Sequence, residues 1–310
     1  MQIKGILVSL LAPMSDHIAN GGEKVLGNAS SIKRRPDGRV YISGQMQRHA
    51  LFSAIDRLNA GDEARGATYV SNGDGVTTVV ETDLRADLGG FLQTKKETYS
   101  GRRTAPLSAT PAVALRESEV GRDLLIRLKI DQTKDTREQA LATREFSQDD
   151  LMHMSFFMDV GAVGIRKRFR YADELHLETH YVKHIAPDER KRRIALALEA
   201  TGSITDYANQ ARNATSAEPQ QVLIVFDTKL SRKAARYFKA SDVERANILR
   251  ELTARGATYF FGDDTSESGD SVFEAYEKAH AFLRANELFD PNPADTTLMT
   301  TAQFEAGAGA

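Results

Sequence analysis

The 310-residue chain contains no cysteine. This absence excludes disulfide bonds, thiolate metal sites and cysteine nucleophiles, and it fits a reducing compartment, so a cytoplasmic location is expected. No stretch approaches the ~20 apolar residues that a membrane span needs. The apolar start at residues 2–11 is short and lacks a small-x-small cleavage pattern, so we interpret it as a buried strand rather than a signal peptide.

Sequence motifs for nucleotide cofactors and for common hydrolytic chemistry are also missing. The chain has no G-x-x-x-x-G-K-[ST] loop, no G-x-G-x-x-G after a strand, no G-x-S-x-G elbow and no H-E-x-x-H pair. Each of these motifs places donors, nucleophiles or ligands at the spacing that its chemistry requires. We therefore expect no cofactor, no metal and no catalytic activity.

Charge is unevenly distributed along the chain. The formal net charge is only −2, which by itself does not indicate a nucleic-acid-binding protein. Residues 251–310, however, contain 11 acidic and 3 basic side chains, a local charge of −8, so the first 250 residues carry about +6 by subtraction. A basic body with an acidic end could bind a polyanion, could dock a second copy head to tail, or could be a solvated surface.

Hydrophobic periodicity predicts an α+β fold with a mixed order of elements. Strands are expected at residues 2–11, 40–42, 77–80, 123–130, 151–165, 221–226 and 258–261, and helices at 45–58, 83–92, 187–200, 241–255 and 271–286. Residues 94–111 are polar and contain proline, so a loop is expected there. A βαββαβ module enlarged by insertions, with helices on one face of its sheet, fits this order. Residues 291–310 are expected to form a flexible tail.

Two groups of residues raise the question of a metal site. His176, His180 and His184 recur at steps of four, which on a helix would place them on one face, although the intervening residues fit a strand equally well. Asp16 lies in the polar region after the first strand. Its carboxylate could hold a divalent metal for phosphodiester chemistry, or it could be an Asx-turn residue, which we favour.

Basic clusters are the strongest binding signal. They are Lys33-Arg34-Arg35, Lys95-Lys96, Arg102-Arg103, Arg166-Lys167-Arg168 with Arg170, and Arg190-Lys191-Arg192-Arg193. Three of them lie in expected loops beside hydroxyl, amide or glycine residues, a setting that donates well to phosphate oxygens. Ser43 is expected to cap the helix at 45–58, and its free N–H groups lie near Gln45 and Arg48. A phosphate placed there would meet several donors together.

Several segments resemble a known family. The strand start Gly5-Ile6-Leu7-Val8, the step Ser43-Gly44-Gln45-x-x-Arg48, residues 103–112, 155–164 and the amide-rich stretch 208–213 are similar to the guide-RNA-binding backbone subunit of CRISPR type I Cascade complexes, in the DevR-like branch associated with type I-B systems. The Ser-Gly-Gln-x-x-Arg step is the most specific of these segments.

The resemblance implies a modified RNA-recognition (ferredoxin-like) fold shaped like a hand. Residues 1–290 would form a single palm domain, with a finger-like region at about 60–120 and a thumb at about 131–150. Copies of the subunit would stack helically along the guide spacer, and each thumb would displace a nucleotide so that exposed guide bases pair with target DNA. The implied partners are CRISPR guide RNA, target DNA, copies of the same chain and other Cascade subunits, in an antiviral ribonucleoprotein.

The resemblance and the basic clusters together nominate the binding residues. The expected RNA-binding residues are Ser43, Gln45, Arg48, Lys24, Asn28, Lys33, Arg34, Arg35, Arg102, Arg103, Arg166, Lys167 and Arg168. Phe146 and Met152 are candidates for the residue that wedges between bases. Contacts to the RNA backbone are favoured over base stacking on the sheet, because a spacer of variable sequence must be held without being read.

Two alternatives remain open from the sequence. One is a metal-dependent ribonuclease that uses Asp16, as related type III backbone subunits use a loop aspartate after the first strand. The other is a homo-oligomeric structural protein that binds no nucleic acid. Loss of Mg²⁺-dependent RNA cleavage in Asp16→Ala would support the first alternative, and absence of bound RNA would support the second.

Overall fold

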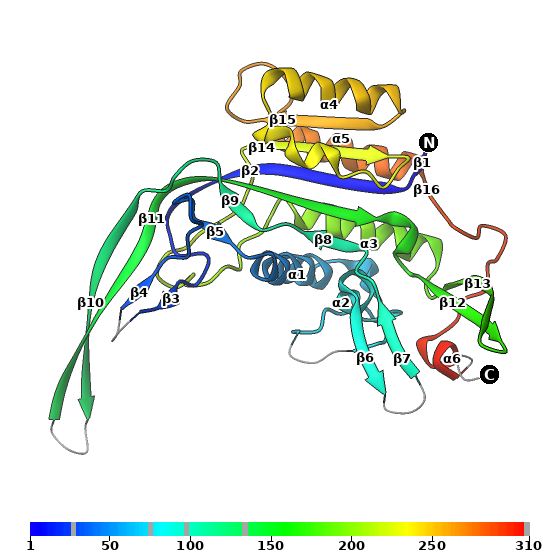
Figure 1. Ribbon diagram of the computed structural model, residues 1–310, viewed down its shortest axis with the longest axis horizontal. Coiled ribbons are helices and arrows are strands. Elements are labelled where there is room, and N and C mark those ends of the chain that lie inside the picture. The colour runs from blue at the N-terminus through cyan, green and yellow to red at the C-terminus, as the bar shows by residue number, and fades with distance from the viewer. Residues whose placement is uncertain (26–28, 74–76, 96–98, 132–135, 307–310) are drawn as a thin grey trace.

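The computed structural model describes residues 1–25, 29–73, 77–95, 99–131 and 136–306 (Figure 1). The α-helices are α1 (Gly44–Ala60), α2 (Leu84–Gly89), α3 (Pro187–Ala200), α4 (Asp242–Ala254), α5 (Val272–Ala285) and α6 (Thr301–Ala306). The 3₁₀ helices of the described residues are η1 (Glu63–Arg65), η2 (Val160–Ala162) and η3 (Lys233–Lys239). The expected α+β class is confirmed, and no helix in the described ranges is long and apolar enough to cross a membrane.

Over the described ranges, the strands form one large sheet and three small ones. They are β1 (Gln2–Ile3), β2 (Gly5–His17), β3 (Glu23–Lys24), β4 (Ser30–Ser31), β5 (Tyr41–Ile42), β6 (Phe91–Lys95), β7 (Tyr99–Arg103), β8 (Leu107–Ala109), β9 (Ala112–Ala114), β10 (Val120–Asp131), β11 (Thr136–Asp159), β12 (Ile165–Ala172), β13 (Leu175–Lys183), β14 (Gln221–Asp227), β15 (Thr258–Asp263) and β16 (Glu287–Leu288). The large sheet runs β15-β14-β2-β11-β4-β3, and β8, β9 and β10 also pair with β11.

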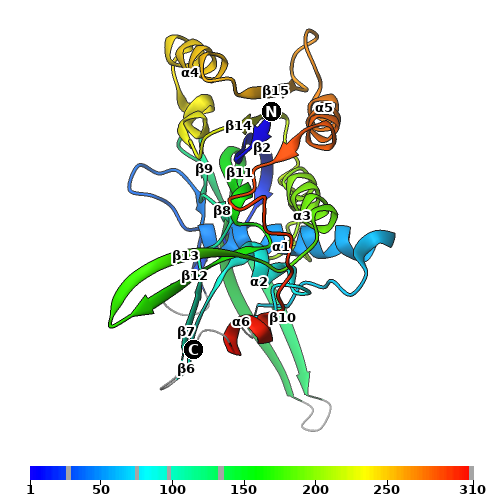
Figure 2. The same cartoon turned by 90° about the vertical axis from the view of Figure 1, so that its right-hand side faces the viewer.

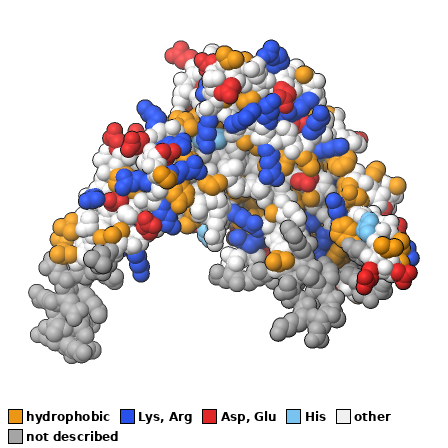
Figure 3. All heavy atoms as spheres, in the orientation of Figure 1, with side chains coloured by type: hydrophobic (Ala, Val, Ile, Leu, Met, Phe, Trp, Pro, Cys, Tyr) orange, Lys and Arg blue, Asp and Glu red, His pale blue; other side chains and the backbone are white. Residues whose placement is uncertain are grey.

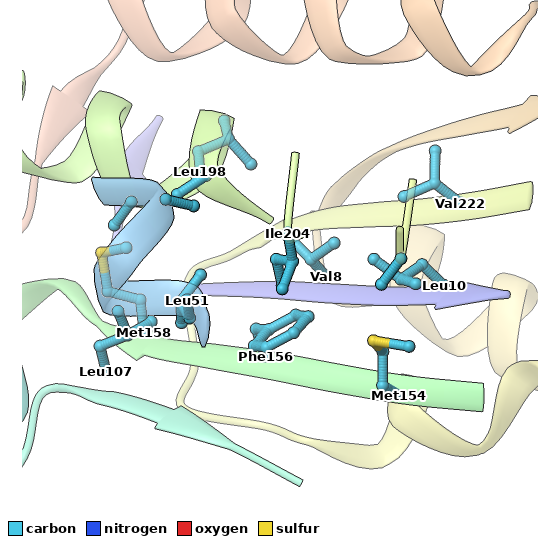
Figure 4. Close-up of a cluster of buried hydrophobic side chains, with 14 of the residues drawn as sticks. Val8, Leu10, Leu51, Leu107, Met154, Phe156, Met158, Leu198, Ile204 and Val222 are labelled. Carbon is cyan, nitrogen blue, oxygen red and sulfur yellow. The ribbon is translucent and has the colours of Figure 1, made fainter. Parts of the chain in front are cut away.

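Alternation along the central strands divides the interior into two cores. Side chains at even positions of β2 and β11, among them Val8, Leu10, Met154 and Phe156, are buried in the larger core with Leu51 and Leu198 (Figure 4). Side chains at odd positions, such as Leu7 and Phe157, point to the opposite face and pack in a smaller cluster. This is the period-2 pattern that a sheet covered on both faces requires.

Helices cover both faces of the sheet, so the expectation of helices on one face is wrong. Figure 2 shows α4 and α5 on opposite sides of the strands. Helices α1, α3 and α5 contribute to the larger core, whereas η3 and α4 supply Phe238, Ile248 and Leu252 to the smaller one. Both faces of β14 are apolar, with six of its seven residues buried, and this leaves no solvent face for polar side chains.

Local signals place the helix starts close to the expected positions. The Ser43 hydroxyl accepts the Met46 N–H at 3.2 Å and caps α1. Capping boxes formed by Ser241 with Glu244, and by Ser271 with Glu274, begin α4 and α5. These contacts satisfy backbone donors that a helix start leaves unpaired.

Strands β10 and β11 extend beyond the sheet as a long antiparallel hairpin, paired from Val120 with Ser147 to Asp131 with Thr136 (Figure 1). The hairpin therefore includes the strand expected at 123–130 and begins earlier than the excursion expected at 131–150. Two further two-stranded sheets, β6/β7 and β12/β13, project from the body on the other side.

Two local predictions are wrong. Residues 77–80 form no strand, because the carbonyls of Thr78 and Val80 accept hydrogen bonds from buried arginine side chains instead of a neighbouring strand. The described part of residues 94–111 is not a loop, since β6 and β7 pair with each other and β8 joins β11. The sequence lacks apolar alternation here, so it gave no strand signal. Two strands that project from the body can still pair through their backbones without it.

The C-terminal segment is also not a free tail over its described part. The Met299 N–H donates to the Lys183 carbonyl at 2.8 Å, and the Thr301 hydroxyl donates to Glu81 at 2.6 Å. Phe304 in α6 is 4% exposed and packs against His184. A single buried aromatic residue thus anchors a polar segment that propensity alone would leave frayed. Residues 307–310 lie outside the described residues.

Candidate nucleic-acid interface

A cationic groove lies beneath η3, on the face of the sheet opposite α1. This η3 groove has a volume of about 480 Å³. Its lining cations are Arg35, Arg232, Lys233, Arg236 and Lys239. The described residues that line it include no carboxylate, although Lys233 also pairs with Glu251 outside it. Figure 3 shows Lys and Arg side chains gathered across the middle of this face. Such a cavity attracts anions.

The floor of the η3 groove is polar but uncharged. His153 and Ser155 line it from odd positions of β11, and Ser9 lies beneath them on β2. The Ser9 hydroxyl lies 3.1 Å from His153 Nε2 and accepts the Ser155 hydroxyl at 3.2 Å. Burial, and then the Lys239 charge, lower the pKa of His153 to about 4, so its imidazole is neutral at neutral pH. Ser9 is fully buried and is not placed to act as a nucleophile.

The cations of the groove act on one another. Partial desolvation, followed by the positive charges of Arg35 and Arg39, lowers the pKa of the Lys239 ammonium. Arg232 also lies over the Phe157 ring, 4.4 Å from its centroid. Mutual repulsion of this kind is relieved when an anion binds, which is the electrostatic arrangement expected of a phosphate-binding surface.

The start of α1 adjoins the η3 groove. A Cβ atom at Gly44 would lie 3.5 Å from the Ala109 carbonyl oxygen and 3.7 Å from Pro111 Cδ. Thr110 and Pro111 form the β8–β9 turn that lines the groove, so Ser43 and Gln45 lie next to it. Both side chains are exposed, while the Ser43 hydroxyl already accepts one backbone N–H as the cap of α1. The structure thus brings the helix start and Arg35 to neighbouring positions.

Arg48 continues this surface past the helix start. Its guanidinium donates to the Gly89 carbonyl and lies 5.7 Å from the Phe52 ring centroid. Burial lowers the pKa of Arg48, yet the side chain still lines an open depression of about 620 Å³ with residues 89–92 and 103–105. We call this the Arg48 depression. We refer to the η3 groove, the α1 start and the Arg48 depression together as the basic track.

The other predicted binding residues are placed as follows. Lys24 is exposed on β3, Lys33 is half-buried, and Arg34 lies 3.9 Å from Glu145. Lys167 is exposed and Arg168 half-buried on β12. Asn28 lies outside the described residues, and Arg102 belongs to the part of β7 whose side chains are not described.

Arg103 and Arg166 are buried, which corrects the expectation that they are surface cations. Arg103 donates to the carbonyls of Asp87, Ile165 and Ala162 and pairs with the Asp87 carboxylate. Arg166 is 6% exposed and donates to the Thr78 carbonyl at 2.9 Å. The guanidinium of Arg103 is fully engaged inside the protein, so we assign it a structural role.

The arginines of the basic run 190–193 likewise form an internal network. Arg190 donates to the carbonyls of Val160, Val163 and Phe289. Arg193 is 0% exposed and bonds to Asp87, Glu189 and two backbone carbonyls. Arg192 pairs with Glu189 and Asp62. These side chains connect α3 to the segments before α2 and around η2, and they are not a phosphate-binding surface.

The two wedge candidates are not at the tip of the β10/β11 hairpin. Met152 occupies an even position of β11 and is fully buried in the larger core, so its selection as a wedge is wrong. Phe146 is half-buried near the base of the hairpin, where its ring covers Gly121 on β10. Neither residue projects from the protruding part of the hairpin.

The residues considered for a metal site do not converge. Asp16 is the penultimate residue of β2, with a φ of 47°, instead of lying in a following loop, and its carbonyl accepts the Asn213 amide at 2.7 Å. His176 and His180 lie on β13 and contact Thr179 and Glu178, whereas His184 follows the strand and donates to the Met299 carbonyl. Within the described ranges, no three His, Asp or Glu side chains are grouped as metal ligands.

Sequence reasoning missed the cations on and beside η3. Arg232, Lys233, Arg236 and Lys239 recur at steps of one, three and three, a spacing that a single helical turn can present to one side. The segment has no strong apolar period, because η3 buries only Ala234 and Phe238. The spacing of these four cations was therefore the only sequence signal that could have indicated a basic surface at η3.

The buried histidines should make stability depend on pH. Burial is the main cause that lowers the pKa of both His153 and His184 from 6.5 to about 4. The unfolded chain therefore binds more protons between these pH values, so stability is full above pH 6.5 and falls as the pH is lowered to about 4. Each histidine should contribute about 3 kcal/mol to this loss.

Urea unfolding at several pH values checks this expectation. His184→Gln should flatten the decline in the free energy of unfolding between pH 6.5 and 4. His49→Gln is the matched control, because the His49 side chain is 51% exposed. Equal slopes for the two variants would contradict the account.

Comparison with known proteins is consistent with this geometry. Residues 23–229 match the model of a family described as CRISPR-associated negative auto-regulator DevR/Csa2. A chain of a CRISPR RNA-guided surveillance complex superposes with a TM-score of 0.55 at 15% identity, covering 90% of this chain and 99% of that chain. A chain of a second such complex, described as pre-nicking, gives 0.54 at 14% identity, covering 90% and 100%. At these identities the likeness shows the fold alone. No curated protein matches.

Proposed function

Since this chain belongs to the CRISPR-associated DevR/Csa2 family, whose model matches residues 23–229, we propose that it is a backbone subunit that binds CRISPR guide RNA in a Cascade complex. The observation that carries the proposal is the η3 groove, in which five cations meet with no carboxylate among the described lining residues. Such a surface binds the phosphates of a single strand without reading its sequence.

The track has the composition expected for backbone binding. Ser43, Gln45 and Arg48 add hydroxyl, amide and guanidinium donors to the groove cations, and each can donate to a phosphate oxygen. The described lining of the η3 groove includes no Phe, Tyr or Trp residue on which bases could stack. We therefore assign this part of the surface to the sugar-phosphate backbone, which leaves the base edges available for pairing with target DNA.

We propose no catalytic role. Asp16 stands at the end of β2, and within the described ranges no grouping of three potential metal ligands accompanies it. No observation therefore favours the metal-dependent ribonuclease alternative. We assign the polar floor around His153 a structural role, because the hydroxyl groups of Ser9 and Ser155 are buried and hydrogen-bonded to each other.

We further propose that the projecting elements have the roles implied by a hand-shaped, RNA-recognition-like architecture. The large sheet with α1 and α3 would be the palm, and the β10/β11 hairpin would be the thumb. The region around β6/β7 would be the finger. In this scheme copies of the chain stack along the guide in the cytoplasm, together with other Cascade subunits.

An apolar stripe on the hairpin supports stacking of copies. Ile126 and Leu141 are Cα partners, and Leu124 lies two residues from Ile126 on the same face. The three side chains are 64% (Leu124), 58% (Ile126) and 52% (Leu141) exposed. An exposed apolar stripe on a hairpin that projects from the body is best explained by contact with a neighbouring subunit. A heterologous contact of this kind builds open, helical assemblies.

Ile126→Lys is therefore expected to break the assembly while leaving each copy folded and able to bind RNA. A lysine on the stripe would have to be desolvated at the contact, which is unfavourable. Native mass spectrometry of the chain produced with its guide RNA measures the number of copies per guide. Val243→Lys on α4 is the control, because Val243 is 72% exposed and distant in sequence from the hairpin.

The same preparation tests the RNA-binding proposal. The protein should purify with nucleic-acid absorbance that high salt removes, and the wild-type chain should show several copies per guide. A clean protein spectrum at low salt would contradict RNA binding. If Ile126→Lys gives the same number of copies per guide as wild type, the role of the stripe is contradicted, but RNA binding is not.

A further inference from the structure

Strand β15 is an open edge of the large sheet. The strand order ends at β15 beyond β14, and within the described ranges no strand pairs with the outer side of β15. Figure 2 shows it at the end of the sheet, between α4 and α5. The opposite edge ends in β3, whose two residues, Glu23 and Lys24, are charged and exposed. An edge so short and charged is protected against pairing with another chain, whereas β15 is built differently.

The sequence of β15 lacks the usual protective features of an edge strand. Residues 258–261 are Thr-Tyr-Phe-Phe, without a charge or a proline, and the register with β14 is continuous from Thr258 to Asp263. All four residues are only half-buried, although three of them are aromatic. Natural proteins normally cover or charge an edge that is regular and apolar, because another strand can pair with it.

The backbone of β15 directs hydrogen-bonding groups away from the sheet. The Asp263 N–H donates outward to the Asp270 carbonyl at 2.9 Å. Because the direction of these groups alternates along a strand, the N–H groups of Tyr259 and Phe261 point outward like that of Asp263. The Asp270 contact lies at the Gly262 end of β15. Tyr259 and Phe261 therefore offer backbone donors to a further strand.

Aromatic packing holds this edge in place from both faces of the sheet. Phe261 lies against Tyr237 and Phe238 of η3, with ring centroids 5.9 and 6.3 Å apart. On the other face, the Phe260 ring centroid lies 5.7 Å from that of Phe282 in α5. The strand is thus already extended and fixed, which lowers the entropy cost of pairing with another segment.

The chain that follows the edge strand is strongly acidic. Residues 263–277 contain six acidic side chains and no basic one, namely Asp263, Asp264, Glu267, Asp270, Glu274 and Glu277. Glu267 is exposed in the connection between β15 and α5. Carboxylates gathered at one end of an open strand favour a partner that carries Lys or Arg there, and they disfavour an acidic partner.

We propose that β15 is a docking edge for an extended, basic segment of a partner protein. The segment adds a strand beside Tyr259 and Phe261 and places Lys or Arg residues against the acidic stretch 263–277. Backbone hydrogen bonds supply the affinity of such a contact, and the charges supply the choice of partner. The proposal does not rest on the guide-binding function, so the two can fail separately.

A labelled synthetic peptide tests the docking edge on the full chain. The peptide alternates Val and Thr and carries Lys and Arg at both ends, and fluorescence anisotropy measures its binding. A peptide with Glu in place of Lys and Arg is the control for charge. The basic peptide should bind and the acidic one should not. Equal binding of the two peptides, or no binding of the basic one, would contradict the proposal.

Tyr259→Pro tests the backbone contact. Proline removes the outward N–H of residue 259 and keeps the preceding residue in the extended region that a strand already occupies. The affinity for the basic peptide should fall about tenfold, as expected for the loss of one hydrogen bond. Tyr259→Val is the matched control, because it replaces the side chain but keeps the N–H, and it should bind nearly as tightly as wild type. Equal affinities of the two variants would overturn the proposal.

Hydrogen exchange of the wild-type chain gives a second measurement that does not depend on the folding of Tyr259→Pro. Without peptide, the amides of Tyr259 and Phe261 should exchange faster than those of Phe260 and Gly262, and saturating basic peptide should slow the first pair. Unchanged exchange would show that nothing docks at β15. If raising the concentration of the chain alone protects the first pair, a second copy covers the edge, and the assignment to a basic partner is wrong.

Discussion

Asp87→Asn is expected to lower the free energy of unfolding by about 3–5 kcal/mol. The Asp87 carboxylate is fully buried, pairs with Arg103, lies 2.8 Å from an Arg193 nitrogen and accepts the Gly164 N–H at 3.0 Å. The substitution would leave two buried guanidinium groups near each other without a compensating charge. Loss of one partner from a buried ion pair is far more costly than loss of a surface pair.

The same network should make the fold sensitive to acid. Burial alone would raise the pKa of Asp87, but the charges of Arg103 and Arg193 outweigh it and hold the pKa below the usual 3.8. Because the folded-state pKa is depressed, the contribution to stability is present above about pH 3.8 and is lost as the pH falls through the lower folded value. Asp87→Asn should remove this part of the acid transition.

Chemical denaturation near neutral pH measures the effect of Asp87→Asn. Asp37→Asn is the control, since Asp37 pairs with Arg39 at the solvent-exposed surface, and its unfolding midpoint should stay close to that of wild type. Similar midpoints for the two variants would show that the Asp87 network does not hold α2, β7 and α3 together.

The network also explains part of the candidate interface. Asp87 lies in α2, and the carbonyl of Gly89 in the same helix accepts the Arg48 hydrogen bond. Arg103, the other partner of Asp87, borders the Arg48 depression. The buried ion pairs of Asp87 therefore hold the walls of the basic track in place, and they do not contact the RNA.

Local signals predicted much of the secondary structure. Ser43 with the following apolar period indicated α1, and Pro187 at the first position indicated α3. The run at 221–226 indicated a buried strand because both of its faces are apolar. These features depend on neighbours in the sequence, so one sequence is sufficient to find them.

The candidate site was less predictable because burial depends on distant partners. Arg193 and Lys239 are both cations in charged segments, but the first meets Asp87 inside the protein and the second lines an open groove. Met152 and His153 are adjacent on β11 and point to opposite faces of the sheet. Only the strand register decides which of them reaches the groove.

Removing three cations from the η3 groove is expected to weaken RNA binding on the order of 100-fold. The triple variant is Arg35→Ala, Arg236→Ala and Lys239→Ala, and all three side chains line the groove. Each cation that neutralises a phosphate releases counterions, so their loss lowers affinity most at low salt. Lys233→Ala is the matched control, because Lys233 is already paired with Glu251 and should contribute less.

The salt dependence of RNA affinity tests the central claim most directly. The dissociation constants of wild type and the triple variant are measured across salt concentrations for two unrelated single-stranded RNAs of equal length. Wild type should bind both sequences about equally, and the slope of log Kd against log salt should be flatter by about two units in the triple variant. A strong preference for one sequence, or equal slopes for the two proteins, would contradict backbone binding in the η3 groove.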